Sequence, residues 1–270
     1  MNKKDLEELC GCRFQSKEEL EEALWKAKTE LESLEGDEIK ASLSDTNRPD
    51  LLSTEGIARE LRYRLGKQKK ILEYKTKKSG IVATVDPALK EIRPKAAYAI
   101  ARNVKVTDAF LRQMIQLQEK ICLTFGQKRK EIAIGVFDLG QVNGNVRYYA
   151  ADLKTEFVPL EYKVKMRLDE ILAEHPKGKE YGQLLKGQKK YPLLVDSKNE
   201  VLSMPPIINS AGSGKVTEKT KNLFLDVTGF SQEKVNTALA VFCAALADRG
   251  AAIGSVEVNY GNKKVTTPFF

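Results

Sequence analysis

The chain has 270 residues and carries 45 Lys and Arg against 37 Asp and Glu, which gives a formal net charge of +8. Its hydrophobic content of 42% is enough for a packed core and excludes a disordered polyelectrolyte. The length allows one large domain or two smaller ones. An excess of basic residues suits a polyanionic partner such as nucleic acid or anionic lipid, and it also serves solubility.

Hydrophobic patterning and cysteine content limit the class of protein further. No apolar run approaches the roughly 20 residues of a membrane-spanning helix, and the first ten residues lack the apolar stretch of a secretory signal. We therefore expect a soluble, cytoplasmic protein with no membrane partner. The four cysteines are too few and too irregularly spaced for a disulfide scaffold, and Cys10-Gly11-Cys12 has no second pair at zinc-ligand spacing. We expect no metal site.

The first 66 residues have the pattern of a small separate unit. Ser16 and Glu19 have the spacing of a capping box, and leucines follow them at helical spacing. The expected elements are a helix over 17–33, a strand over 39–43, a turn over 45–50 and a helix that ends at Gly66. This order predicts a small α/β module.

A lysine-rich segment, KQKKILEYKTKK at residues 67–78, follows this unit. It holds six lysines and one glutamate and shows little apolar periodicity. We place the domain boundary here, with an amino-terminal module over residues 1–80 and a larger domain over residues 81–270. The segment is interpreted as a solvated linker. The alternative is an arm that contacts phosphates, because lysines around Tyr74 could follow a nucleic-acid backbone.

Beyond residue 80, strand and helix patterns alternate without the regular order of a doubly wound fold. Extended segments are expected over 81–85, 97–104, 131–138, 146–151, 193–196, 201–204, 223–227 and 255–260. Helices are expected over 107–125, 167–174, 179–185 and 231–248, with an interruption at 175–178. The fold class is therefore α+β: a small α/β module followed by a mixed, mainly antiparallel domain.

Candidate catalytic residues are sparse. His175 is the single histidine and precedes a proline in a lysine-flanked turn, so we do not expect a Ser/His/Asp or Cys/His arrangement, which would have to use it. Residues 212–215 lack the earlier glycine and the strand of a nucleotide-binding loop and are interpreted as a turn. Gln118 and Glu119 lie on the long helix, with Glu119 off its apolar face. A solvated polar face and a functional role are equally consistent with this position.

The segment MPPIINS, residues 204–210, has a different character. Its two prolines exclude a regular β-ladder, and apolar residues flank them. This combination predicts a buried, rigid turn. Such a turn would present Ser203 and Asn209 at the rim of a pocket.

Longer strings carry a resemblance to a known family. They are, in chain order, DTNRPDLLSTEGIARELRYRLG (45–66), LQEK (117–120), KRKEIAIGVFDL (128–139), FVPL (157–160), HPKGKEYG (175–182), YPLL (191–194), VLSMPPIINS (201–210) and NLFLDVTG (222–229). With these strings, nearly the whole chain resembles the β subunit of phenylalanyl-tRNA synthetase of archaeal and eukaryotic type. The resemblance implies an amino-terminal α/β module followed by the tRNA-editing domain, which hydrolyses tyrosine wrongly attached to phenylalanine tRNA.

The resemblance also implies partners. In this family the β subunit continues into further domains and packs against an α subunit that holds the adenylation site. The implied partners are therefore tRNA(Phe) and the α subunit. The chain itself is expected to use no cofactor, since ATP and Mg²⁺ belong to the complete synthetase. The alternative is a non-catalytic tRNA-binding or subunit-docking module, or a remnant whose pocket no longer functions.

The family's editing-site residues map onto matching motifs. Four residues would lie around the scissile ester, hold the terminal adenosine and position water: Gln118, Glu119, Arg129 and Asn209. Three would form the wall that receives the tyrosine side chain: Leu194, Ser203 and Thr228. In our hypothesis Arg129 supplies positive charge or orders Glu119. Hydrolysis of an activated ester needs little more than a positioned water and a stabilised oxyanion, so a catalytic histidine is not required.

The sequence departs from the family pattern in two places. Phe137 stands where relatives often have histidine, and Ala211-Gly212 stands where an acidic or polar residue is usual. These departures motivate the remnant alternative.

Overall fold

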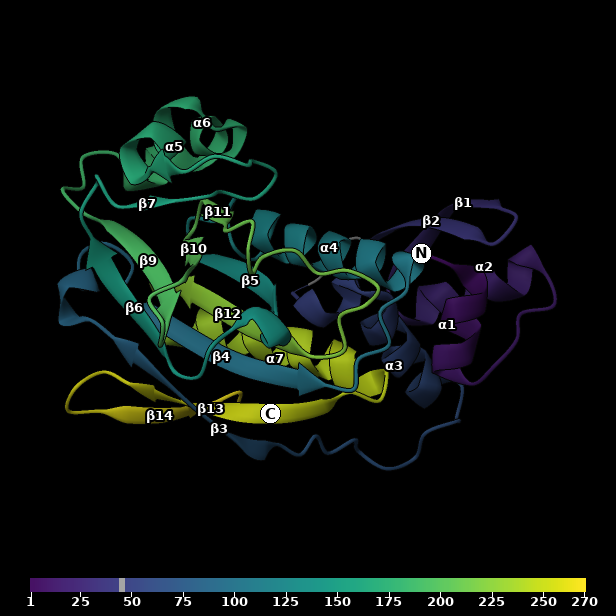
Figure 1. Cartoon of the computed structure of the whole chain (residues 1–270). Helices are drawn as coiled ribbons and strands as arrows, with labels where there is room; N and C mark the ends of the chain where they lie inside the picture. Colours follow the sequence, from purple (N-terminus) through teal and green to yellow (C-terminus); the bar gives the residue numbers. More distant parts are fainter. Residues whose placement is uncertain (44–46) are drawn as a thin grey trace.

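A ten-stranded sheet forms the centre of the molecule (Figure 1). The computed structural model describes residues 1–43 and 47–270. The strand order is β11-β10-β9-β6-β3-β13-β4-β12-β5, and β14 pairs with β13. These strands are β3 (Lys77–Val85), β4 (Lys95–Arg102), β5 (Ile132–Asp138), β6 (Val146–Ala151), β9 (Tyr191–Asp196), β10 (Val201–Met204), β11 (Ile208–Asn209), β12 (Leu223–Gly229), β13 (Ala252–Asn259) and β14 (Lys264–Thr267).

The remaining elements are mostly helical. The helices are α1 (Lys3–Cys10), α2 (Lys17–Lys26), α3 (Thr54–Arg64), α4 (Asp108–Leu123), α5 (Leu168–Glu174), α6 (Pro176–Tyr181) and α7 (Gln232–Asp248). Two short hairpins complete the fold, β1 (Thr29–Glu35) with β2 (Glu38–Leu43) and β7 (Glu156–Phe157) with β8 (Met166–Arg167). In the central sheet only the ladders of β3 with β13 and with β6 are parallel. The predicted α+β class with a mainly antiparallel sheet is confirmed.

Both faces of the sheet are buried, which explains the almost continuous apolar run in β4. Successive side chains of a strand point to opposite faces. Ala97 and Ala99 pack with α4 and α7 on one face. Tyr98 and Ile100 belong to the core on the other face, which also contains Leu168 and Ile171 of α5 and Tyr181 of α6. A pocket in this sheet therefore has packed layers on either side.

The segment between β6 and β9 carries the one histidine. The interruption expected at 175–178 is present but limited to His175, because α5 ends at Glu174 and α6 begins at Pro176. A proline is tolerated at the first position of a helix, where its missing N–H is not needed. The Nδ1 atom of His175 accepts a hydrogen bond from the Lys177 N–H at 3.1 Å, and the side chain is buried. His175 thus caps α6, which is a structural role.

The amino-terminal module has its own core under α1, α2 and α3. The capping box is present, since Ser16 Oγ accepts from the Glu19 N–H at 3.1 Å. The helix expected over 17–33 is wrong in its second half: α2 ends at Lys26, and β1 then pairs with β2. Pairing across a hairpin outweighs the helical spacing of the leucines here. The turn expected at 45–50 begins in residues 44–46, which lie outside the described residues.

Ion pairs join the module to the end of α7. Arg59 donates to Asp248 Oδ2 at 2.7 Å, and Tyr74 of the lysine-rich segment donates its hydroxyl proton to Asp248 Oδ1 at 2.7 Å. Arg249 contacts Asp5 and Glu55. The strand β3 begins at Lys77, so residues 77–80 belong to the central sheet rather than to the module or a linker. In the described ranges no helix is long and apolar enough to cross a membrane.

Candidate functional site

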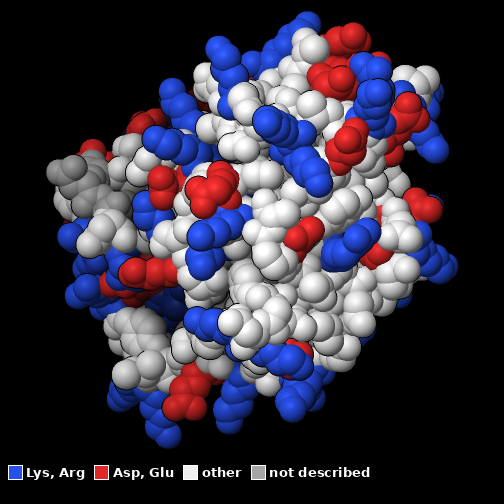
Figure 2. Space-filling model, turned by 90° about the vertical axis from the view of Figure 1, so that its left-hand side faces the viewer, with Lys and Arg blue, Asp and Glu red and all other residues white. Residues whose placement is uncertain are grey.

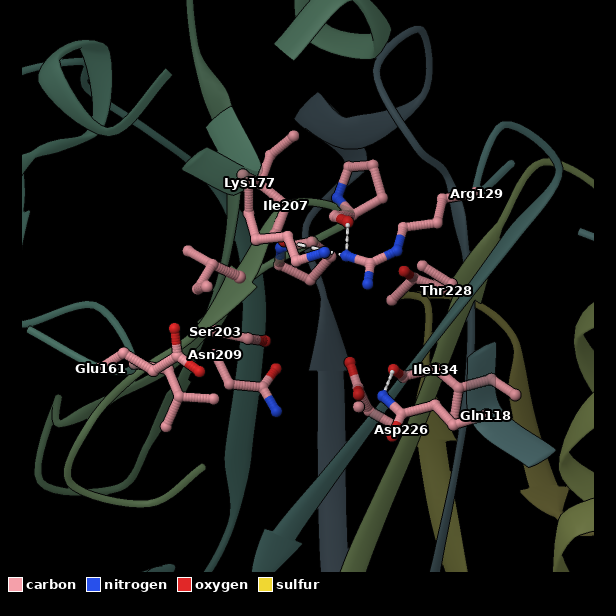
Figure 3. Close-up of a pocket in the computed structure, with 16 residues that line it drawn as sticks. Gln118, Arg129, Ile134, Glu161, Lys177, Ser203, Ile207, Asn209, Asp226 and Thr228 are labelled. Carbon is pink, nitrogen blue, oxygen red and sulfur yellow. Dashed lines mark hydrogen bonds between the residues drawn. The ribbon is translucent and has the colours of Figure 1, made fainter. Parts of the chain in front are cut away.

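A pocket of about 150 Å³ opens between β12, β5 and the turn that joins β10 to β11 (Figure 3). Its walls come from distant parts of the chain. The polar side chains that line it are Gln118, Arg129, Glu161, Lys177, Ser203, Asn209, Asp226 and Thr228. The turn with the two prolines forms one wall, as its composition predicted.

The sheet forms the floor of the pocket. Asp226 and Thr228 are two residues apart on β12 and therefore point to the same face. Gly135 lies opposite Asp226 in the ladder, and a Cβ atom there would come within 1.9 Å of Asp226 Oδ1. Only glycine leaves room for this carboxyl group. Across the pocket, Ser203 projects from β10 (Figure 3).

Two polar atoms of the pocket are buried without a hydrogen-bond partner among the described groups: Asp226 Oδ1 on the floor and Ser203 Oγ on the opposite wall. Burial raises the pKa of Asp226 to about 7, against the opposing effects of the Gly135 N–H and the Arg93 charge. Leaving such groups unpaired costs about 1–3 kcal/mol each. Unpaired polar atoms that line a pocket are suited to a hydrogen-bonding ligand group.

Irregular segments form the rim. Arg129 donates from one terminal nitrogen to the carbonyl oxygens of Pro206 at 3.1 Å and Ile207 at 2.9 Å (Figure 3). Its guanidinium carbon lies 4.2 Å from the ring centre of Tyr181, at the end of α6. Arg129 therefore ties the proline turn to α6 and places a positive charge at the rim.

The loop that presents Arg129 has an uncommon backbone. Gln127, Lys128 and Arg129 all have positive φ angles, of 48°, 56° and 67°. For residues other than glycine the left-handed region costs about 1–2 kcal/mol each. Backbone hydrogen bonds hold the loop, including one from the Arg129 N–H to the Cys122 carbonyl oxygen at 2.9 Å. Strain of this kind often occurs at functional sites.

The structure brings together five of the seven site residues expected from the sequence: Gln118, Arg129, Asn209, Ser203 and Thr228. Gln118 donates its side-chain N–H to the Ile134 carbonyl oxygen at 2.7 Å, and Asn209 makes a long contact of 3.4 Å to that of Val136. These two contacts orient both amide groups at the pocket.

Glu119 and Leu194 do not line this pocket. Glu119 is exposed and faces a separate groove between α4 and the β1–β2 hairpin. The hydrogen bonds of Arg129 go to the proline turn and not to Glu119, so the expected ordering of Glu119 by Arg129 is not found. Leu194 is fully buried and is paired with Ser203 between β9 and β10, so it packs in the core beside this wall without lining the pocket.

Sequence reasoning missed Asp226. The signal was present, since a carboxylate inside the buried apolar strand LFLDVTG, two positions before Thr228, must share its face. Glu161, Lys177 and the supporting Tyr181 were also missed. These three come from loops and short helices whose position no periodicity predicts.

The positions that depart from the family pattern lie away from the lining. Phe137 is fully buried, with its ring centre 6.1 Å from that of Phe224. Ala211 donates its N–H to the Val158 carbonyl oxygen at 2.8 Å. Neither change removes a polar group from the pocket. Among the described residues there is no cluster of three or more His, Cys, Asp and Glu that could hold a metal ion.

Charge on the surface is mixed rather than gathered. Figure 2 shows basic and acidic side chains interspersed around an uncharged area on one face of the molecule. On this face the net charge of +8 does not form one continuous basic patch. The distribution of charge therefore does not identify a binding surface on this face.

Comparison with known proteins identifies the class of protein that this fold and pocket resemble. The model of the B3/4 domain family matches residues 92–243, which include the sheet floor and both rim segments of the pocket. The phenylalanine–tRNA ligase β subunit of Thermococcus kodakarensis is 50% identical over 272 residues, covering 99% of this chain and 47% of that protein. The same subunit of Pyrococcus horikoshii is 49% identical and is covered to 49%.

A solved structure extends this likeness to the fold. The amino-terminal fragment of the phenylalanyl-tRNA synthetase β subunit from Pyrococcus horikoshii has a TM-score of 0.96 and 49% identity, covering all of this chain and 78% of the fragment. The chain belongs to the phenylalanyl-tRNA synthetase β-subunit family and corresponds to its amino-terminal portion. It spans about half the length of the curated relatives that it matches.

Proposed function

We propose that this chain is an editing module that hydrolyses the ester of tyrosine mischarged on tRNA(Phe). The observation that carries this proposal is the pair of buried, unpaired polar atoms in the pocket: Asp226 Oδ1 on the floor beside Thr228, and Ser203 Oγ on the opposite wall. A phenolic hydroxyl can both donate and accept hydrogen bonds, so it can satisfy groups of this kind. Membership in a synthetase β-subunit family is consistent with such a substrate.

The floor supplies a physical basis for discrimination. When tyrosine enters, its hydroxyl can donate to Asp226 and accept from a hydroxyl group of the pocket, that of Ser203 or Thr228. When phenylalanine enters, these groups stay desolvated and unpaired, at a cost of about 1–3 kcal/mol per group. A site built to hydrogen-bond a substrate hydroxyl can reject the analogue that lacks it far more strongly than a purely apolar pocket can. The pocket thus acts as a second sieve that spares the correct product.

The rim supplies the groups for hydrolysis. We assign Asn209, Gln118 and Arg129 to hold the terminal adenosine and to position water at the ester carbonyl. Their amide and guanidinium N–H groups can stabilise the negative charge that develops on the carbonyl oxygen. Because an aminoacyl ester is activated, this positioning is sufficient without a histidine base. Glu119 has no role in this scheme, since it faces the other side of α4.

The proposal also specifies partners and requirements. The macromolecular partners would be tRNA(Phe) and the α subunit of the synthetase. Ester hydrolysis consumes only water, so the chain would need no ATP, and Mg²⁺ would serve the tRNA and the adenylation reaction elsewhere in the enzyme.

The test is to incubate the chain with tRNA(Phe) charged with tyrosine or with phenylalanine and to follow ester loss against a control without protein. Faster loss of tyrosine only is the expected result. No acceleration of either loss, together with measurable tRNA binding, would favour the non-catalytic binding or docking module instead. Failure to bind tRNA even at low salt would indicate a remnant without function, because phosphate contacts strengthen as salt is lowered.

A further inference from the structure

A fully buried arginine lies behind the pocket floor and outside the lining. Arg93 is 2% exposed and follows the turn that precedes β4. Its Nε donates to Thr228 Oγ1 at 2.9 Å, and one terminal nitrogen donates to the Thr228 carbonyl oxygen at 2.6 Å. The other terminal nitrogen donates to the Lys130 carbonyl oxygen at 3.2 Å. The acceptors are one hydroxyl and two carbonyl oxygens, and none is a carboxylate.

Burying a guanidinium without a paired carboxylate is expensive, so its hydrogen bonds must offset the lost hydration. Burial lowers the pKa of Arg93, in the direction that opposes its charge. Two of the three hydrogen bonds go to Thr228, one to its hydroxyl and one to its carbonyl oxygen, so the guanidinium fixes both the side chain and the backbone of this pocket residue.

The hydrogen bond from Arg93 limits the orientation of the Thr228 hydroxyl group. A guanidinium has only donors, whereas a hydroxyl has one proton and can also accept. Since Thr228 Oγ1 accepts from Arg93, its own proton can be donated either into the pocket, which Thr228 lines, or to the neighbouring Tyr148 hydroxyl. Without Arg93, the hydroxyl could turn and present its lone pairs to the pocket instead.

We propose that Arg93 is a positioning residue that determines specificity, because it commits the Thr228 hydroxyl to donate its proton to the phenolic oxygen of a tyrosyl substrate. This proposal rests on the editing function proposed above and names the origin of its selectivity. The phenolic hydroxyl then donates to the Asp226 carboxylate and accepts from Thr228, so both of its hydrogen-bonding capacities are used. Phenylalanine offers no partner to the Thr228 proton or to the Asp226 carboxylate.

The test compares tyrosine and phenylalanine in two measurements on the 270-residue chain. One is kcat/KM for hydrolysis of the two charged tRNAs. The other is equilibrium binding of adenosine that carries tyrosine or phenylalanine through a 3′-amide, which cannot be hydrolysed as an ester. The variants are Arg93→Met, Arg93→Lys, Thr228→Val and the double variant Arg93→Met with Thr228→Val. The matched control is Arg102→Met, at the exposed end of β4.

We expect Arg93→Met to lower the tyrosine-to-phenylalanine ratio about 10- to 100-fold, which corresponds to the loss of one or two hydrogen bonds to a desolvated group. Arg93→Lys keeps a charged donor and should retain part of the ratio. In the Thr228→Val background Arg93→Met should change the ratio less than about twofold, because the hydroxyl through which it acts is already gone. A purely structural role would not produce this non-additivity. Arg102→Met should leave the ratio unchanged.

Tyr148 provides the sharpest internal check, because its hydroxyl lies beside both Arg93 and Thr228. If Tyr148→Phe lowers the ratio as much as Arg93→Met does, the donor is Tyr148, and the assignment to Thr228 is overturned. Folded Arg93→Met and Arg93→Lys variants that keep the wild-type ratio overturn the role of Arg93 but leave editing intact. If Arg93→Met does not fold, Arg93→Lys and the comparison with Thr228→Val decide.

The two proposals fail in different ways. A wild-type chain that hydrolyses neither ester but binds the tyrosyl amide preferentially, with the preference lost in Arg93→Met, supports the role of Arg93 and contradicts hydrolysis. A wild-type chain with no preference in either measurement overturns both proposals.

Discussion

The floor and the rim of the pocket differ in backbone structure: the floor consists of regular strands and the rim of irregular loops. The floor lies on β12 and β5, where continuous ladders fix Asp226 and Thr228 on one face. The rim consists of a left-handed loop and a proline turn, held by the contacts of Arg129. In our interpretation the floor selects the side chain and the rim carries out hydrolysis. Specificity and rate can therefore be changed separately, which the following experiments test from the largest expected effect to the smallest.

Asn209→Ala tests the rim. We expect kcat/KM for both charged tRNAs to fall about 10²- to 10³-fold, as for loss of a single donor to a developing oxyanion. The ratio of tyrosine to phenylalanine should stay within about threefold of wild type, since the floor is intact. Single-turnover deacylation measures both quantities. Asn262→Ala, at an exposed position, is the matched control. A fall in kcat/KM for the tyrosine ester alone would show that the floor and the rim do not act separately.

Asp226→Asn tests the floor. The change keeps the shape but removes the carboxylate that accepts from the phenol, so the tyrosine-to-phenylalanine ratio should fall about 10- to 100-fold. Hydrolysis of the phenylalanine ester should change little. The same deacylation assay measures this, with Asp152→Asn as an exposed control. An unchanged ratio would remove Asp226 from substrate recognition.

The buried carboxyl group should also affect the dependence of stability on pH. The folded chain keeps the Asp226 proton up to about pH 7, whereas the unfolded chain loses it near the ordinary value of 3.8. The free energy of unfolding should therefore fall as the pH rises from about 4 to 7. Asp226→Asn removes this contribution and should be more stable than wild type at pH 8 by about 1–3 kcal/mol, the cost of an unpaired buried group. Urea denaturation at pH 5 and pH 8 tests this, and parallel curves for the two proteins would contradict it.

Lys128→Gly tests the strain in the rim. Glycine adopts positive φ without the penalty of other residues, but it loses more chain entropy on folding. The two effects leave a net stabilisation of about 0.5–1 kcal/mol. A rise in Tm together with a fall in kcat would show that the strained loop serves catalysis. Gly substitution at the exposed Lys130, which lies just beyond the three positive-φ residues, provides the control and should destabilise slightly.

The sequence predicted the larger elements well because their patterns are local. The helix expected over 107–125 and the strand over 146–151 correspond to α4 and β6. The helix over 17–33 failed because residues beyond Lys26 pair with β2, a contact that local spacing does not reveal. Long-range pairing also decides which residues meet at the pocket.

The site could be predicted only in part, for geometric reasons. Gln118 and Glu119 are neighbours in one motif, but about 100° separates them around a helix, so only Gln118 reaches the pocket. Leu194 is paired with Ser203 of the pocket wall, but it is fully buried in the core and does not line the pocket. The positions of Asp226 and Arg93 near Thr228 depend on the pairing of β12 with β4, which the sequence alone does not reveal.

The ion pairs at the end of α7 have a consequence for how the chain can be divided. Asp248 has a side chain that is only 5% exposed, and its partners are Arg59, Arg62 and Tyr74. Cutting the chain near residue 80 would strip this carboxylate of all three and leave an unpaired charge at the end of α7. The amino-terminal module therefore stabilises the larger domain that holds the pocket. We expect the module and this domain to unfold together in a single cooperative transition.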